Sequence, residues 1–229
     1  MLCLRKFSMK ISGIYTRVKK FLRERCCGDS KQITVEAIRE QIPSYLAQAD
    51  KDKLANALED FPHAFEYYTN RYPDEVLQGD GWNTFVVFDY ATGNRKPVKG
   101  ILLTNSCDVS PENTREFPPN YTFAPIIKLN NYLKLLEGTG LTRQQIDSKV
   151  ASIKEQRVSN IVYLPSGANL DDDYIALLGD VHTVPQNVFE SRTDRQKLFT
   201  LSQNGFYLFI FKLSVHFCRL HENVERGVA

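Results

Sequence analysis

The chain has 229 residues, 42% hydrophobic and 24% charged, a composition typical of a folded soluble protein that is long enough to bury a core. Its 29 Lys and Arg residues against 27 Asp and Glu residues give a net charge of +2. This balance excludes a general nucleic-acid binder that acts through bulk charge, so such a role would need a local basic patch. We expect one main domain with an appendage.

The five cysteines do not predict a disulfide framework. Their number is odd, Cys26 and Cys27 are adjacent and are poor partners for each other, and no secretory hydrophobic segment precedes them. The most apolar run, residues 205–218, is interrupted by Lys212 and His216 and is shorter than the roughly 20 residues that cross a bilayer. We therefore expect a reduced, cytoplasmic protein in which this run is a buried core element.

A basic amphipathic helix is expected near the N-terminus. Apolar residues recur at helical spacing over residues 11–22, and Gly28 ends the pattern. Most basic residues lie off the apolar stripe, and the candidates for partner binding are Arg17, Lys19, Lys20, Arg23 and Arg25. Such a face suits RNA, a protein groove or a membrane surface. The simpler interpretation is a helix that packs on its own domain with a solvated basic side.

Three further helices are expected before residue 79. Helical spacing begins at Thr34, which is placed to cap the first of them, again after Asp50, and again from Pro62 through Tyr68. Together they predict a helical region over residues 1–78. The turn-rich stretch at 78–81 then marks the boundary to a second domain, residues 79–229.

Strand patterns begin after this boundary. Residues 82–90 are aromatic and β-branched, residues 91–96 carry a turn signal, and residues 97–104 complete an expected hairpin. Beyond the hairpin, strands are expected at residues 121–129, 160–165, 174–181 and 183–188, and helices at residues 130–138, 141–156 and 206–220.

Short strands with helical insertions favour a small barrel, because alternating βα units and a phosphate-binding glycine motif are missing. Four short motifs carry a resemblance: Gly79-Asp80 before an aromatic strand, a turn with Arg95 and Pro97, Leu103-Thr104-Asn105, and Phe123-Ala124-Pro125-Ile126. They resemble the SH3-like barrel of the PemK/MazF toxin superfamily over residues 79–129, about a quarter of the chain. The expected fold is thus α+β, an SH3-like small β-barrel with helical insertions, an N-terminal helical extension and a closing C-terminal helix.

The resemblance implies an endoribonuclease in a bacterial toxin or defence context. In that family an arginine near the first hairpin and a hydroxyl residue just after the third strand act on the scissile phosphate and the 2′-hydroxyl. Arg95 matches the first role, although a solvated residue at a hairpin tip is the simpler interpretation. Ile127 stands at the second position and can exchange no proton. We therefore expect a barrel that has lost catalysis and binds a macromolecular partner, either a protein or RNA, with the ribonuclease as the alternative.

Cys107 raises a third hypothesis, a cysteine-dependent hydrolase. The Cys107-Asp108 pair is similar to one found in a longer branch of such barrels. A nucleophilic thiolate needs a base and a group that orients the base, and the candidates are His182 with Asp108 or Asp180. The alternative, which we expect, is that Cys107 is a small structural residue buried at the end of an apolar strand.

No metal and no cofactor are expected. Of His216, Cys218 and His221, only Cys218 and His221 share a helix face, whereas a structural zinc site needs four ligands. The acidic run at residues 169–174 lacks the alternating ligands of an EF-hand, and it predicts a turn that leads into a strand.

Overall fold

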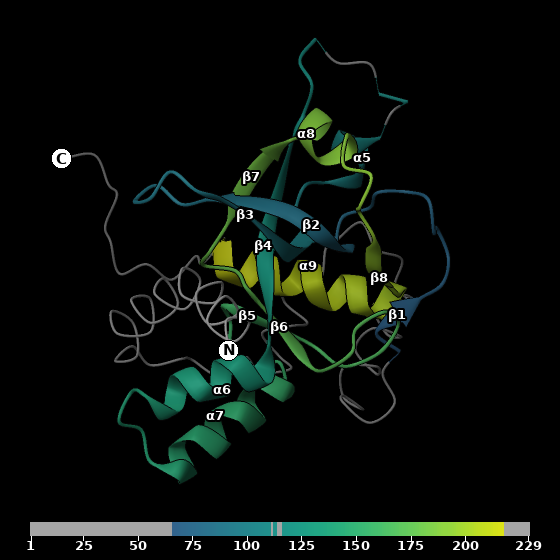
Figure 1. Ribbon diagram of the computed structural model, residues 1–229. Coiled ribbons are helices and arrows are strands. Elements are labelled where there is room, and N and C mark those ends of the chain that lie inside the picture. Colours follow the sequence, from purple (N-terminus) through teal and green to yellow (C-terminus); the bar gives the residue numbers. More distant parts are fainter. Residues whose placement is uncertain (1–65, 111, 114–115, 218–229) are drawn as a thin grey trace, which may run out of the picture.

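The computed structural model describes residues 66–110, 112–113 and 116–217. The three helices expected up to Pro62, the basic residues between positions 17 and 25, Cys218 and His221 lie outside the described residues. Figure 1 shows a strongly curled sheet with helices around it, and every strand pairing within the described part is antiparallel. The molecule is therefore an α+β half-barrel, as the sequence predicts at this level.

The sheet runs in the order β1-β8-β2-β3-β4-β6-β5, and β7 pairs with β4 off this path. The strands are β1 (Tyr68–Thr69), β2 (Gly81–Phe88), β3 (Arg95–Leu102), β4 (Asn120–Lys128), β5 (Ile161–Leu164), β6 (Tyr174–Leu177), β7 (His182–Pro185) and β8 (Lys197–Leu201). The helices are α5 (Ser106–Val109), α6 (Leu129–Glu137), α7 (Arg143–Lys154), α8 (Gln186–Glu190) and α9 (Gln203–Phe217).

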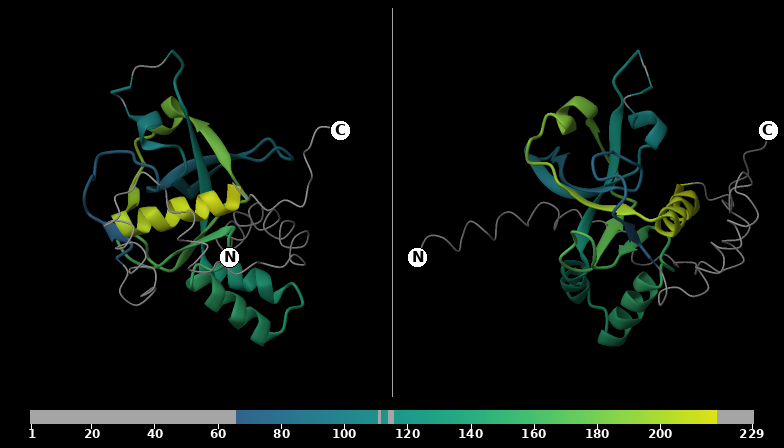
Figure 2. Two further views of the ribbon diagram at one scale, coloured as in Figure 1. Left: turned by 180° about the vertical axis from the view of Figure 1, so that it is seen from behind. Right: turned by 90° about the vertical axis from the view of Figure 1, so that its right-hand side faces the viewer.

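The helices cover separate parts of the sheet. In the two views of Figure 2, α9 lies along one side of the curled sheet, while α6 and α7 pack side by side at one end. Short α5 and α8 lie toward the opposite end. Within the described ranges, none of the helices has the length and apolar character needed to cross a membrane.

Strands β2 and β3 form the expected hairpin. Their register places Phe85 opposite Val98, and both side chains are buried. At the turn, the side chain of Asp89 accepts a hydrogen bond from the backbone N–H of Ala91 at 2.9 Å. Gly93 has a φ of +70°, a backbone conformation in which a residue with a side chain would be strained. Local turn chemistry thus agrees with the strand pattern on either side.

The long strand β4 links two parts of the curled sheet. Near its start Phe123 is the register partner of both Leu102 on β3 and His182 on β7, and near its end Ile127 pairs with Ile175 on β6. The strand has nine residues, most of them buried. Because the sheet twists and curls along this length, one end of β4 pairs with β3 and β7 and the other end pairs with β6.

Three apolar clusters form the core. One lies between α6, α7 and strands β5 and β6, a second lies under α9, and the third is enclosed by β2, β3, β4, β7 and α8. The third cluster contains two stacked phenylalanine pairs: Phe85 and Phe123 have ring centroids 4.2 Å apart, and Phe85 and Phe189 have centroids 4.9 Å apart. Such pairs add about 0.5–1.5 kcal/mol each beyond the area that they bury.

A buried lysine and a buried glutamine join α9 to the end of α7. Lys212 on α9 is 0% exposed, and its ammonium donates to the carbonyl oxygens of Gln156 at 2.8 Å and Val158 at 2.5 Å. The Gln156 side chain accepts the backbone N–H of Tyr163 and donates to the carbonyl oxygen of the same residue, at 3.0 and 2.6 Å. This amide satisfies the outer edge of β5, where a neighbouring strand is missing from the described sheet order.

The sheet also departs from the expected element pattern. Tyr68 lies in β1, which pairs with β8, so the helix expected from Pro62 does not reach it and the sheet begins before residue 79. Strand β8 and the short helices α5 and α8 were not expected, and α8 replaces the second half of the strand expected at residues 183–188.

Candidate functional site

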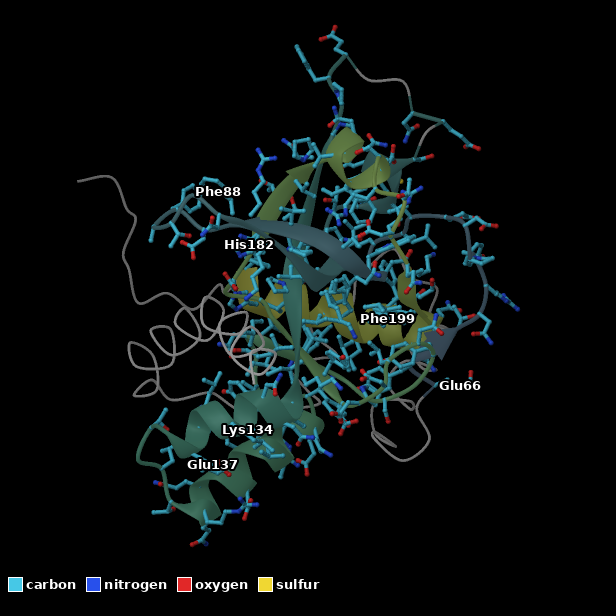
Figure 3. The ribbon with its side chains drawn as sticks, in the orientation of Figure 1. Glu66, Phe88, Lys134, Glu137, His182 and Phe199 are labelled. Atoms are coloured by element: carbon cyan, nitrogen blue, oxygen red, sulfur yellow. The ribbon has the colours of Figure 1, made fainter. Side chains whose placement is uncertain are left out.

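Arg95 lies at the tip of the β2–β3 hairpin together with two exposed aromatic side chains. It is the register partner of Phe88, so the two side chains share the outer face of the hairpin. Phe88 is 41% exposed and Tyr90 is 85% exposed, and their rings meet edge to face with centroids 5.1 Å apart. We call Phe88, Tyr90 and Arg95 the hairpin tip; Figure 3 shows Phe88 out along this hairpin.

Lys96 lies next to the hairpin tip but on the other face of β3. It pairs with Val87, which belongs to the third core cluster, and its side chain is half-buried. Burial lowers the pKa of Lys96, and the nearby Asp89 carboxylate opposes this effect. The hairpin therefore has one exposed cation, Arg95, and one half-buried cation, Lys96, on the face of β3 that packs against the core.

Cys107 is exposed, so the expectation that it is buried at a strand end was wrong. The chain leaves β3 at Leu102 and enters the single-turn helix α5, in which the Asn105 side chain caps the Cys107 N–H at 2.9 Å. Two residues later in this turn Val109 is 3% exposed. Because residues two apart on a helix point about 200° away from each other, a buried Val109 turns Cys107 toward solvent.

The rest of α5 is anchored by local contacts. The Asn113 amide donates to the carbonyl oxygen of Cys107 at 2.5 Å, and the Ser106 hydroxyl accepts the backbone N–H of Gln78 at 2.9 Å. Asp108 is exposed beside Cys107. Cys107 and Asp108 thus lie in a one-turn helix that hydrogen bonds from the neighbouring loops hold in place.

His182 and Asp180 form a hydrogen-bonded pair. The imidazole Nε2 lies 2.9 Å from an Asp180 carboxylate oxygen, across the bend between β6 and β7. The ring also stacks on Phe123, with centroids 5.8 Å apart, and the His182 side chain is 15% exposed. Figure 3 shows His182 where β7 begins. Asp180 is therefore the carboxylate that orients this imidazole.

Arg95 and Cys107 belong to opposite ends of β3. Arg95 is its first residue. Cys107 lies beyond its last residue, Leu102, in helix α5. Eight residues of strand span about 23 Å at roughly 3.3 Å per residue. A single small-molecule or phosphodiester site cannot use both side chains in this arrangement.

The acidic run before β6 is neutralised by lysines. Asp171 forms an ion pair with Lys128 at 2.6 Å, and Asp173 forms one with Lys154 at 3.0 Å. The Lys128 ammonium, joined by the Tyr174 hydroxyl, lowers the pKa of Asp171 to about 2. In the described part of the chain, no group of three or more His, Cys, Asp or Glu residues is arranged to hold a metal ion.

Sequence reasoning missed a cluster of charged and aromatic side chains where β2 and β8 begin. Asp80, the second residue of the Gly79-Asp80 motif, is 0% exposed and forms an ion pair with Lys197 at 2.9 Å. The Lys197 ammonium also donates to the Tyr72 carbonyl oxygen at 2.6 Å and lies 5.3 Å from the centre of the Trp82 ring. Burial raises the pKa of Asp80, and the hydrogen bond from Lys197 opposes that rise.

No protein-family model matches this chain, and a search of curated proteins finds no relative.

Proposed function

We propose that this chain is an SH3-like barrel that binds a macromolecular partner without performing catalysis of its own. The observation that carries the proposal is the hairpin tip, where two aromatic side chains and an arginine are displayed together on an exposed hairpin. Tyrosine and arginine are among the residues that dominate binding energy at protein interfaces, and aromatic rings beside cations also serve single-stranded nucleic acid. The basic residues Arg17, Lys19, Lys20, Arg23 and Arg25 would add to a contact with an anionic partner.

The placement of the candidate catalytic residues favours binding over catalysis. Arg95 is the first residue of β3 and Cys107 comes after its last residue, so the two side chains belong to opposite ends of the strand. Ile127, the residue at the position where the PemK/MazF resemblance implies a hydroxyl group, has an apolar side chain and packs against the first core cluster. A ribonuclease would therefore lack the proton-exchanging group that the resemblance implies at this position.

The test compares the hairpin tip with an equally exposed aromatic residue elsewhere. Phe117 is 79% exposed and lies in the loop before β4, so Phe117→Ala is a matched control for Tyr90→Ala. The full chain is purified by affinity, its absorbance ratio at 260 and 280 nm is recorded, and copurified proteins are identified by mass spectrometry. We expect one partner that the Tyr90→Ala, Arg95→Gln double variant loses and the Phe117→Ala variant retains.

Two results would contradict the proposal. Equal recovery of every partner by the double variant and by the control would show that the hairpin tip makes no contact. Cleavage of single-stranded RNA by the purified chain, lost in Arg95→Gln, would instead support the endoribonuclease. The absorbance ratio separates the two kinds of partner, because bound RNA raises it and a bound protein does not.

A further inference from the structure

Arg195 lies in the segment between α8 and β8, and its guanidinium is seated on two aromatic rings. The guanidinium carbon is 5.9 Å from the centre of the Trp82 ring and 5.8 Å from the centre of the Phe189 ring. The two rings meet edge to face at 5.6 Å and 89°, and both are buried in the third core cluster. We call Trp82, Phe189 and Arg195 the arginine seat. Cation–π contact with two buried rings favours this position of the guanidinium.

The guanidinium of Arg195 differs from its charged neighbours because its charge is uncompensated in the described part of the chain. Arg192 is held by Asp194 through two hydrogen bonds, at 3.1 and 2.8 Å, and Lys197 is paired with the buried Asp80. Arg195 is partly exposed, and among the described residues no carboxylate oxygen lies within the 4.0 Å that defines an ion pair with it. Its donors are therefore available to a ligand.

Glu190 is the acidic residue next to the arginine seat, and its carboxylate already accepts hydrogen bonds from other side chains. One carboxylate oxygen accepts hydrogen bonds from the Tyr121 hydroxyl and the Gln186 amide, both at 2.8 Å. Arg195 is close enough to oppose the rise in the pKa of Tyr121, whose main causes are burial and the bond to Glu190. The seat thus lies at the edge of a polar group that fixes α8 to β4.

The indole under Arg195 supplies an independent observation. Trp82 is 6% exposed, and its Nε1 donor is buried without an acceptor among the described residues. Most buried donors in folded proteins have an acceptor, so a donor without one is an exception that needs an explanation. An indole donor without an acceptor, in the ring that lies under an uncompensated guanidinium, points to an acceptor-rich ligand.

We propose that the arginine seat binds an oxyanion, a phosphate or carboxylate group, through two parallel hydrogen bonds from the Arg195 guanidinium. The planar fork of arginine matches two oxygens of either group, and both rings lie within cation–π range of the guanidinium carbon, at 5.9 and 5.8 Å. This site goes beyond the proposed macromolecular contact, because none of its three residues belongs to the hairpin tip.

The chain supplies its own reporter for this site, since Trp82 is its single tryptophan. The full chain is titrated with inorganic phosphate and, separately, with acetate, while sodium chloride keeps the ionic strength constant. We expect a saturable change in tryptophan fluorescence and a matching shift of the one indole N–H signal in the NMR spectrum. Arg195→Gln should weaken this response more than about tenfold, since a hydrogen bond to a charged group contributes about 1.5–3 kcal/mol.

Arg192→Gln is the matched control. It also removes one positive charge, three residues before Arg195, but Arg192 already has a carboxylate partner in Asp194. It should leave the response unchanged. A response to phosphate alone identifies a phosphoryl ligand, and a response to both anions identifies a site that also takes carboxylates. The proposal is wrong if neither anion gives a saturable response, or if both glutamine variants respond alike. Should Arg195→Gln fail to fold by circular dichroism, Arg195→Lys replaces it, and wild-type affinity in that variant would overturn the proposal.

Discussion

Lys212 predicts an unusual dependence of stability on pH. Its ammonium is fully buried and has two backbone carbonyl groups as acceptors. Burial lowers its pKa from 10.5 to about 7 in the folded protein. In the unfolded chain the ammonium returns to water and to its ordinary pKa. A shift of this size corresponds to roughly 5 kcal/mol of unfolding free energy, since one pKa unit is worth about 1.36 kcal/mol.

The sign follows from proton counting. Between about pH 7 and pH 10.5 the unfolded chain binds a proton at Lys212 that the folded protein does not bind. The contribution of Lys212 to the unfolding free energy therefore increases as the pH rises through this window, and it is least favourable below pH 7. From pH 7 to pH 9 the expected increase is about 2 kcal/mol.

The assay is urea unfolding of the wild-type chain and of Lys212→Met at pH 6, 7, 8 and 9, followed by circular dichroism. Subtracting the two profiles removes the titration of groups common to both proteins, and the difference should grow by about 2 kcal/mol between pH 7 and pH 9. Lys134→Met, at an exposed position of α6 labelled in Figure 3, is the control and should keep the wild-type profile. A difference between wild type and Lys212→Met that stays constant within about 0.5 kcal/mol would refute the reasoning.

Three more variants test the structure directly. Lys197→Met leaves the buried Asp80 carboxylate without its ion-pair partner and should lower the unfolding free energy by roughly 3–5 kcal/mol, whereas a loss below about 1 kcal/mol in urea unfolding would count against a buried pair. Gln156→Leu strips the backbone of Tyr163 of two partners and should cost roughly 2 kcal/mol or more, which thermal unfolding can measure. Cys107→Ala should change stability by no more than about 0.5 kcal/mol, and peptide mapping after iodoacetamide treatment should find Cys107 alkylated in the folded chain; protection of this thiol would contradict its exposure.

Local patterns in the sequence predict those elements whose neighbours along the chain determine them. The β2–β3 hairpin has alternating side chains and a turn with its own hydrogen bonds, and α7 begins with a Thr142 capping box. Strand β8 was missed because it has only five residues, KLFTL, which are too few for its alternation to stand out from the polar residues on either side. Helix α5 is a single turn, too short for any periodicity to show, and the burial of Cys107 was therefore inferred from β3 instead.

The arginine seat could not be predicted because it depends on which strands become neighbours. The alternation of β2 indicates that Trp82 faces a core, but it does not identify the strand beside it. That strand is β8, and the register pairs Trp82 with Lys197, more than 100 residues later, next to an irregularity between Gly81 and Trp82. A shift of one residue in this register would turn the side chain of Lys197 to the opposite face of the sheet, away from Trp82 and Asp80. Because Asp80 is buried and needs a cation, the Asp80–Lys197 ion pair helps to select the observed register, and the same register brings Arg195 over the Trp82 ring.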